Sequence, residues 1–385
     1  MEARDALRGT VADGFEPVRD EFAAVVAAEG GGFSAQLAAY RHGQPVVDLW
    51  TGPEITGDSL LGVFSASKGA AHLVVALLVQ DGVLDLDQQV SHYWPEFAVE
   101  GKREITLREL LAHRAGLVGA DTGFTLAELA DDRAVAERLG AQCPYWRPGT
   151  AFGYHALVIA ALSGEVVRRA TGQTIAEHFA TRVRGPHAVD LYLGLPRDHE
   201  ARFLSAQPML ATPERLAALA ATATGPGSLT GIAFNRHHPG SPQVWELPNF
   251  PAVRAGGPAS FGGVASARGL TRMYAAAISS LDGAAPLLKP DTAAAFAQIH
   301  SIGYDLVTRD HKAFGAGFHI TSEYYPVLGQ GSFGHSGAGG QQAFADPRHG
   351  LAYGYSRRRF PFPAAAAPEN DRLIRALYAA ASALP

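Results

Sequence analysis

Apolar and polar positions alternate near both ends of the chain and follow a helical spacing through most of its middle. Residues 34–41 and 44–50 flank His42-Gly43, a pattern that predicts a β-hairpin. Further strands with tight turns between them are predicted late in the chain, at residues 315–321, 332–335, 341–346 and 351–356. We therefore expect the two ends of the chain to pair in one antiparallel sheet.

Helical spacing predicts a mainly helical region between these strands, and one further helix before the hairpin and one after the last strand. The predicted helices span residues 13–28, 65–79, 105–113, 126–139, about 156–170, 174–183, 212–223, 266–280 and 368–384.

The pattern as a whole predicts an α/β (α+β) fold with two parts. Residues 1–65 and 310–385 are expected to form a sheet domain flanked by helices. Residues 66–309 are expected to form an inserted, mainly helical domain, with a long ordered loop at 225–263 that is rich in Pro and Gly. Ser65 falls at the boundary between the two, and ligand sites usually form in clefts between such parts.

A candidate reactive pair lies at that boundary. Ser65 and Lys68 stand three residues apart at the start of an apolar run, and residues with this spacing share one face of a helix. A hydroxyl and an amine placed in this way are a nucleophile and a candidate base. Chance would produce about 0.2 such pairs in a chain with nineteen serines and four lysines. The alternative is an ordinary helix start, with Ser65 as a cap and Lys68 reaching into solvent.

Composition and charge argue against several classes of protein. The formal net charge of −5 offers no attraction for nucleic acid. Residues 1–8 lack the apolar core of a signal peptide, and no apolar run approaches the roughly 20 residues of a membrane span. We therefore expect a cytoplasmic protein with no membrane partner. The single Cys143 and the pair His237-His238 have no neighbours at ligand spacing, so no metal or cofactor is expected.

Two further motifs follow Ser65-x-x-Lys68 in order. Tyr154 comes after the Pro148-Gly149 loop, and His335-Ser336-Gly337 lies on a predicted late strand. Together the three motifs resemble those of the serine β-lactamase and penicillin-binding-protein superfamily, and most closely its class C β-lactamase-like branch, which includes the family VIII carboxylesterases. The resemblance covers most of the chain. No Gly-x-Ser-x-Gly occurs, so an α/β-hydrolase nucleophile is not the alternative.

The resemblance implies a role for each motif. Ser65 would form an acyl-enzyme with the substrate carbonyl, while Lys68 and Tyr154 would act as general base and acid. The backbone N–H groups of Ser65 and Ala338 would form the oxyanion hole. Which of Lys68 and Tyr154 carries the proton at rest is a coupled question that sequence leaves open. Taken alone, Tyr154 would more often be an aromatic packing residue beside Phe152, and the glycines around Ala338 could mark only a bulge or turn.

Two departures from the family pattern bear on the substrate. Lactamases and peptidases of this kind usually carry Tyr-x-Asn, where this chain has Tyr154-His155-Ala156. They also usually carry Lys-Thr-Gly, where this chain has His335-Ser336-Gly337. His335 is a weaker partner than Lys for a substrate carboxylate, because histidine is largely neutral at pH 7. Both changes weaken the case for β-lactam or D-alanyl peptide substrates and favour small carboxylic esters.

The remaining expectations concern the pocket and the rival functions. The residues that we expect to contact substrate are Asp121, Phe124, His155, His335, Ser336 and Gly337. An acyltransferase, a β-lactamase or D-aminopeptidase, and a non-catalytic binding protein are the alternatives to a small-ester hydrolase. The binding protein is the least favoured of these, because Ser65, Lys68 and Tyr154 are all present.

Overall fold

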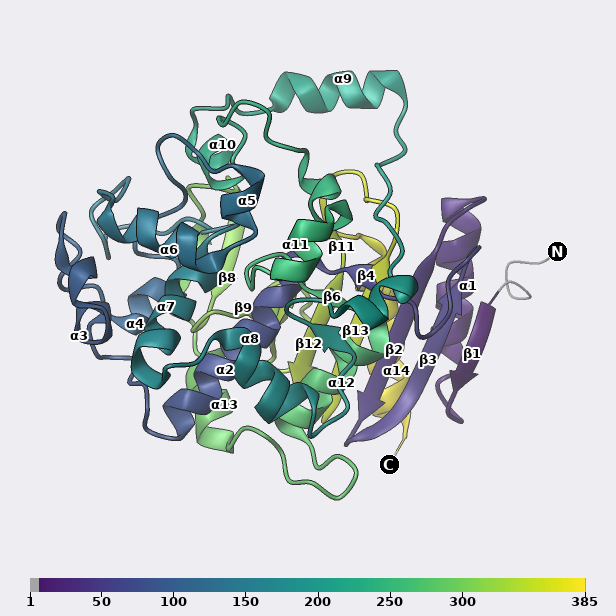
Figure 1. Cartoon of the computed structure of the whole chain (residues 1–385). Helices are drawn as coiled ribbons and strands as arrows, with labels where there is room; N and C mark the ends of the chain where they lie inside the picture. Colours follow the sequence, from purple (N-terminus) through teal and green to yellow (C-terminus); the bar gives the residue numbers. More distant parts are fainter. Residues whose placement is uncertain (1–6, 385) are drawn as a thin grey trace.

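Strands from both ends of the chain lie side by side in one nine-stranded antiparallel sheet. The computed structural model describes residues 7–384, and the sheet order is β1-β3-β2-β13-β12-β10-β9-β8-β7 (Figure 1). The strands are β1 (Leu7–Val11), β2 (Ala35–Arg41), β3 (Gln44–Thr51), β7 (Ser301–Tyr304), β8 (His311–Phe314), β9 (His319–Ile320), β10 (Phe333–Ser336), β12 (Gln342–Asp346) and β13 (Leu351–Arg357).

The pairing of β2 with β13 joins the two ends of the chain, with Arg41 opposite Leu351 and Ala38 opposite Gly354. The two faces of this pair carry different helices, because side chains alternate along a strand. On one face Tyr355 packs against Phe22 of α1 (Glu16–Glu29) and donates a hydrogen bond to Glu369 of α14 (Glu369–Ala383).

On the other face α12 (Ala267–Ile278) lies against β2, β12 and β13. A β-carbon at Gly354 would stand 2.3 Å from Oγ1 of Thr271, so α12 can approach this strand only over a glycine. The sheet is therefore covered on both faces, and α12 lies between it and the helical region.

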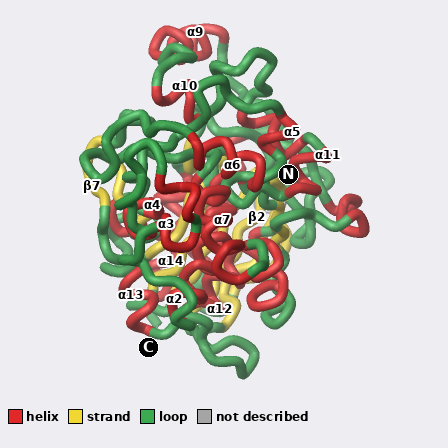
Figure 2. The backbone as a smooth tube through the Cα atoms, turned by 60° about the vertical axis from the view of Figure 1, so that its left-hand side comes forward, coloured by secondary structure: helices red, strands yellow, loops and turns green. Residues whose placement is uncertain are grey.

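The helical region surrounds α2 (Ser67–Gln80), in which every residue from Ser67 to Leu78 is buried. Figure 2 shows α4, α6 and α7 in front of the strands. Other helices of the region are α3 (Val90–Tyr93), α4 (Leu107–Leu111), α5 (Leu126–Leu129), α6 (Asp132–Ala141), α7 (Ile159–Thr171), α8 (Ile175–Phe179) and α13 (Pro290–Ala297), with the 3₁₀ helices η2 (Pro95–Ala98) and η4 (Arg197–Arg202) and the π-helix η3 (Ala180–Arg184).

The predicted helix at 126–139 is two helices, because Asp131 interrupts it and caps the second with its side chain. The segment 225–263 contains α10 (Leu229–Ala233), η5 (Val244–Asn249) and α11 (Pro251–Gly256). The helix predicted at 212–223 is α9 (Pro213–Thr222), which has no buried residue and stands at the top of Figure 1.

The late strands also differ in detail from the expected pattern. Of the strand predicted at 315–321, only His319 and Ile320 pair in the sheet, and a 3₁₀ turn, η6 (Thr321–Glu323), follows directly. Strands β7 and β8 and helix α13 had no counterpart in the pattern. β7 and α12 lie within the predicted helical segment 66–309, and both contact the sheet domain.

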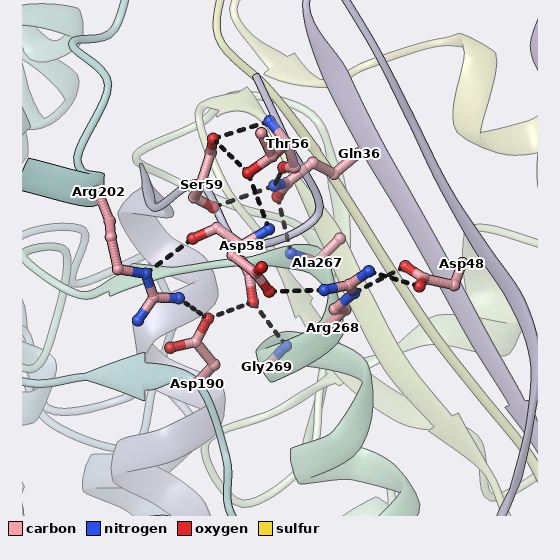
Figure 3. Close-up of polar contacts among 11 residues, drawn as sticks. Gln36, Asp48, Thr56, Asp58, Ser59, Asp190, Arg202, Ala267, Arg268 and Gly269 are labelled. Carbon is pink, nitrogen blue, oxygen red and sulfur yellow. Dashed lines mark hydrogen bonds and ion pairs between the residues drawn. The ribbon is translucent and has the colours of Figure 1, made fainter. Parts of the chain in front are cut away.

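A polar network anchors the segment that leads to Ser65 (Figure 3). Gln36 on β2 donates to the carbonyls of Thr56 and Ser59 at 2.6 and 3.0 Å, and its side-chain oxygen accepts from the Ala267 N–H at 3.0 Å. Arg268 on α12 bridges Asp48 and Asp58, with contacts of 2.7 and 2.6 Å. Residues 56–59 are thus tied both to the sheet and to α12.

Two small sheets complete the surroundings of the site. In one of them, β4 (Leu61–Gly62) and β5 (Leu191–Tyr192) flank β6 (Val264–Ala265). The pairing of β4 with β6 fixes the chain just before Ser65. β11 (Gly339–Gly340), which follows shortly after β10 in the chain, pairs with β14 (Ala365–Ala366). Residues from both ends and from the middle of the chain therefore meet at Ser65.

Candidate active site

Ser65 lies in a tight turn between β4 and α2. The turn is a single 3₁₀ helix, η1 (Phe64–Ala66), and Phe64 has φ of +48°, a left-handed conformation that non-glycine residues rarely adopt. The Ser67 hydroxyl holds the turn, because it donates to the Phe64 carbonyl at 2.5 Å and accepts from the Gly263 N–H at 2.9 Å. As a result Ser65 remains partly exposed although its neighbours are buried.

Lys68 is fully buried one turn further along α2. Its Nζ lies 2.6 Å from the Ala156 carbonyl oxygen, 2.7 Å from that of Ser260 and 3.1 Å from Ser65 Oγ. Burial lowers the pKa of Lys68 well below its usual 10.5, and the negative charge of Asp132 opposes this effect. A neutral amine has two N–H groups and one lone pair. Two carbonyls take the N–H groups, and the lone pair then faces the Ser65 hydroxyl.

Tyr154 lies in the irregular segment before α7, and its hydroxyl is hydrogen-bonded to the Ser65 side chain. Its ring stacks on Phe314 at 5.9 Å, and Lys68 Nζ lies 4.9 Å from the ring centre. Burial raises the pKa of Tyr154 above its usual 10.0, while the interaction with the Ser65 side chain acts in the opposite direction. The pKa of Lys68 is lowered and that of Tyr154 is raised, and both directions favour a neutral amine beside a protonated phenol.

Buried histidines surround this group. His335 stacks on His319 at 3.9 Å and faces the ring of Tyr154 at 6.0 Å, and its Nδ1 donates to the Ser336 carbonyl. Burial lowers the pKa of both His335 and His319 well below 6.5. His335 is therefore neutral near pH 7 and provides no cation for a substrate carboxylate.

His155 has a structural environment. Its Nε2 accepts from the Leu117 N–H at 3.1 Å, so its Nδ1 carries the proton and donates to the Gly153 carbonyl at 2.7 Å. The backbone N–H of His155 donates to His113 Nδ1 at 3.1 Å. Burial lowers the pKa of His155 to about 4. This side chain holds the segment that carries Tyr154 and Ala156.

The end of β10 comes very close to the Ser65 turn. A β-carbon at Gly337 would stand 2.4 Å from the Val63 carbonyl oxygen, and one at Gly339 would stand 2.6 Å from the Phe64 ring. Glycine is thus required at both positions for the strand to approach. Ala338, between them, lines the same cavity as Ser65.

That cavity has a volume of about 420 Å³, within the range of small-molecule sites. Ser65, Tyr154, Ser336, Gly337 and Ala338 line one part of it. The rest of the lining includes residues that the sequence pattern did not single out: Thr230, Phe234, Lys312, His319, Thr321, Tyr324, Tyr325 and Gln342. Several of these come from α10, β8 and β9, elements that carry no recognisable motif.

The other predicted pocket residues lie outside this lining. His155 and His335 are buried behind it. Asp121 is exposed and its carboxylate accepts from the Tyr145 hydroxyl at 2.6 Å. Phe124 is buried, and its backbone N–H donates to Asn235.

Within residues 7–384, no group of three or more His, Cys, Asp or Glu side chains is arranged to hold a metal ion. In the same part of the chain, every helix is too short or too polar to cross a bilayer.

Comparison with known proteins defines the class. The profile of the Beta-lactamase family matches residues 18–377, so the chain belongs to that family. This confirms both the resemblance and the fold class predicted from the sequence.

Three relatives narrow the comparison. The structure of EstA from Arthrobacter nitroguajacolicus has 41% identity and a TM-score of 0.90, covering 97% of this chain and 98% of that one. A family VIII carboxylesterase structure has 30% identity and a TM-score of 0.85, covering 97% and 99%. Esterase/beta-lactamase LipL from Mycobacterium tuberculosis is 31% identical, over 85% of this chain and 77% of its own. The chain is an esterase-like hydrolase of the beta-lactamase family.

Proposed function

We propose that this protein is a serine esterase that cleaves small carboxylic esters through an acyl-Ser65 intermediate. The observation that carries the proposal is the contact between Ser65 Oγ and the Lys68 amine, 3.1 Å apart, with the amine buried and its other two partners both carbonyls. An amine in that environment is a base, because its protonated form is disfavoured by burial.

Acylation follows from the hydrogen bonds. Ser65 Oγ attacks the ester carbonyl carbon while its proton passes to Lys68 Nζ. The backbone N–H groups of Ser65 and Ala338 stabilise the oxyanion that forms. When the C–O bond breaks, Tyr154 gives its proton to the departing alkoxide, and the Lys68 ammonium restores the phenol. Each proton is accounted for, and the alcohol leaves neutral.

Deacylation repeats the same steps with water as the nucleophile. Water attacks the acyl carbon, its proton goes to the Lys68–Tyr154 pair, and Ser65 recovers a proton as the acid departs. While Lys68 is transiently protonated, the carbonyls of Ala156 and Ser260 and the ring of Tyr154 surround its charge.

Two features favour esters over β-lactams or peptides. Ala156 presents no side-chain amide to a substrate, and His335 is buried and neutral. One similar structure is that of a family VIII carboxylesterase, and the relative LipL is named as an esterase. β-Lactam hydrolysis is the second candidate, because LipL is named for both activities.

The test uses a chromogenic short-chain ester and a chromogenic cephalosporin side by side. We expect turnover of the ester, little turnover of the cephalosporin, and no ester turnover by Ser65→Ala. An alkyl phosphonate should add its mass to the peptide that contains Ser65, and Ser65→Ala should remain unlabelled. Undiminished ester hydrolysis by Ser65→Ala would rule out the proposal.

A further inference from the structure

One buried carboxylate connects to Lys68 through the backbone. Asp132 is the first residue of α6, and its Oδ2 accepts from the Ala259 N–H at 2.8 Å. The next residue, Ser260, provides the carbonyl that accepts from Lys68 Nζ at 2.7 Å. The Ser260 hydroxyl also accepts from the Ala160 N–H at 2.8 Å, so this segment is held on two sides.

Asp132 does not meet the substrate. It lines a second cavity, of about 370 Å³, that shares no lining residue with the cavity at Ser65. Its Oδ1 is buried and has no hydrogen-bond partner among the described residues. Any influence of Asp132 on the reaction must therefore pass through Lys68 and the 259–260 segment.

We propose that Asp132 is a positioning residue that holds the Ser260 carbonyl against Lys68 and, through its negative charge, sets the pH range in which the Lys68 amine is neutral. This rests on the proposed function, in which Lys68 is the base.

The electrostatics of both groups agree with this arrangement. The charge of Asp132 raises the pKa of Lys68 against the effect of burial, and the charge of Lys68 in turn lowers the pKa of Asp132. Burial is the larger influence on Asp132 and raises its pKa to about 6, although the Ala259 N–H lowers it. The carboxylate thus changes charge close to neutral pH, where an esterase works.

Other charged groups lie around the pair. Asp131, the cap of α6, raises the pKa of Asp132, and Arg133 lines the same cavity. On α7, Glu165 and Arg168 also line it and form an ion pair at 2.6 Å. Near Lys68 lie the ring of Tyr154, at 4.9 Å, and several histidines that feel its charge and whose pKa burial keeps low: His72, His113, His319 and His335.

The decisive variant is Asp132→Asn, which keeps an oxygen for the Ala259 N–H and removes only the charge. A protonated Lys68 then loses its nearby counter-charge. The acid limb of the kcat/KM profile for a short-chain ester should move to lower pH, by about one unit for loss of a charge partner. KM should change little. Asp132→Glu, which restores the charge, should return the limb toward its original position.

Asp131→Asn is the matched control. It removes the same charge one residue away and keeps the cap that Asp131 provides to the Arg133 N–H. Loss of this neighbour lowers the pKa of Asp132, so Asp132 stays charged to lower pH. The acid limb should therefore not move downward in Asp131→Asn.

Rates are expressed per active site, counted by phosphonate labelling of Ser65, so that misfolded protein does not enter the comparison. If Asp132→Asn and the unaltered protein share one acid limb while both hydrolyse the ester through Ser65, the inference is overturned and the proposed function stands. If the unaltered protein hydrolyses no ester, or Ser65→Ala does so equally well, it is the proposed function that fails.

Discussion

Gly337 faces the carbonyl oxygen of Val63 so closely that a β-carbon would stand only 2.4 Å from it. This contact fixes the distance between the last residues of β10 and the turn that presents Ser65. Ala338, directly after Gly337, carries the N–H that we assign to the oxyanion hole.

Gly337→Ala should therefore push the strand away from Ser65 and misplace that N–H. We expect kcat for a short-chain ester to fall by about 100-fold, the usual cost of one oxyanion donor. Gly31→Ala is the control, because a β-carbon there meets nothing within 4 Å. Steady-state kinetics of both variants check this, and equal kcat values would contradict it.

Lys68 and Tyr154 should behave as one unit. Lys68→Met and Tyr154→Phe are each expected to lower kcat/KM by several orders of magnitude. The double variant should have a kcat/KM only slightly below that of the less active single variant. Tyr145→Phe is a suitable control, since its hydroxyl contacts Asp121 outside the cavity. Additive losses in the double variant would show that the two groups act independently.

A lysine at position 335 should not convert the protein into a β-lactamase. His335 is fully buried and stacked on His319, so the Lys ammonium would enter a site with no described counter-charge beside it. We expect His335→Lys to lose roughly 3–5 kcal/mol of stability, the cost of an uncompensated buried charge. Thermal unfolding and cephalosporin turnover measure both consequences. A stable variant with new lactamase activity would refute this interpretation.

Acid should destabilise the fold. Burial lowers the pKa of His72 to about 3 and that of His155 to about 4, against about 6.5 in an unfolded chain. Between pH 6.5 and those values the unfolded chain binds more protons, so stability falls as pH falls, by up to about 1.4 kcal/mol per pH unit for each histidine. Asp132 has a pKa raised to about 6, so its protonation stabilises the folded state as pH falls. This one group offsets only part of the loss caused by the two histidines.

Urea unfolding at several values between pH 7 and pH 4 would reveal this trend. In the variant His72→Leu the free energy of unfolding should decline less steeply with falling pH, because the unfolded chain then gains one proton fewer relative to the folded chain. A free energy of unfolding that stays constant over this range would be inconsistent with neutral buried histidines.

The fold class was predictable because its main signals are local. The alternation at 34–50 and 341–356 defines strands, and the apolar run after Lys68 defines a buried helix. β7 and β8 were not predicted because each has only four residues, and in β7 the polar Ser301 is buried while the apolar Ile302 and Tyr304 are exposed. The helix break at Asp131 was not predicted, because the apolar spacing continues across it. Only the capping side chain of Asp131 marks the start of the new helix.

The site likewise contains residues that the sequence predicts and residues that it does not. Ser65, Lys68 and Tyr154 are marked by residue type and order, and they lie within contact of one another. The partners of Lys68 are backbone carbonyls, which no residue type reveals. Asp121 and Phe124 do not line the cavity, because the Asp121 carboxylate binds the Tyr145 hydroxyl and the Phe124 N–H donates to Asn235.

The pairing of β2 with β13 has a consequence for how this protein is made. Arg41 and Leu351 pair although they lie 310 positions apart in the sequence. During translation the hairpin must therefore wait, with one edge unpaired, until residues 351–357 have left the ribosome. Contacts this remote in sequence slow folding, so newly made chains remain dependent on protection from aggregation for most of their synthesis.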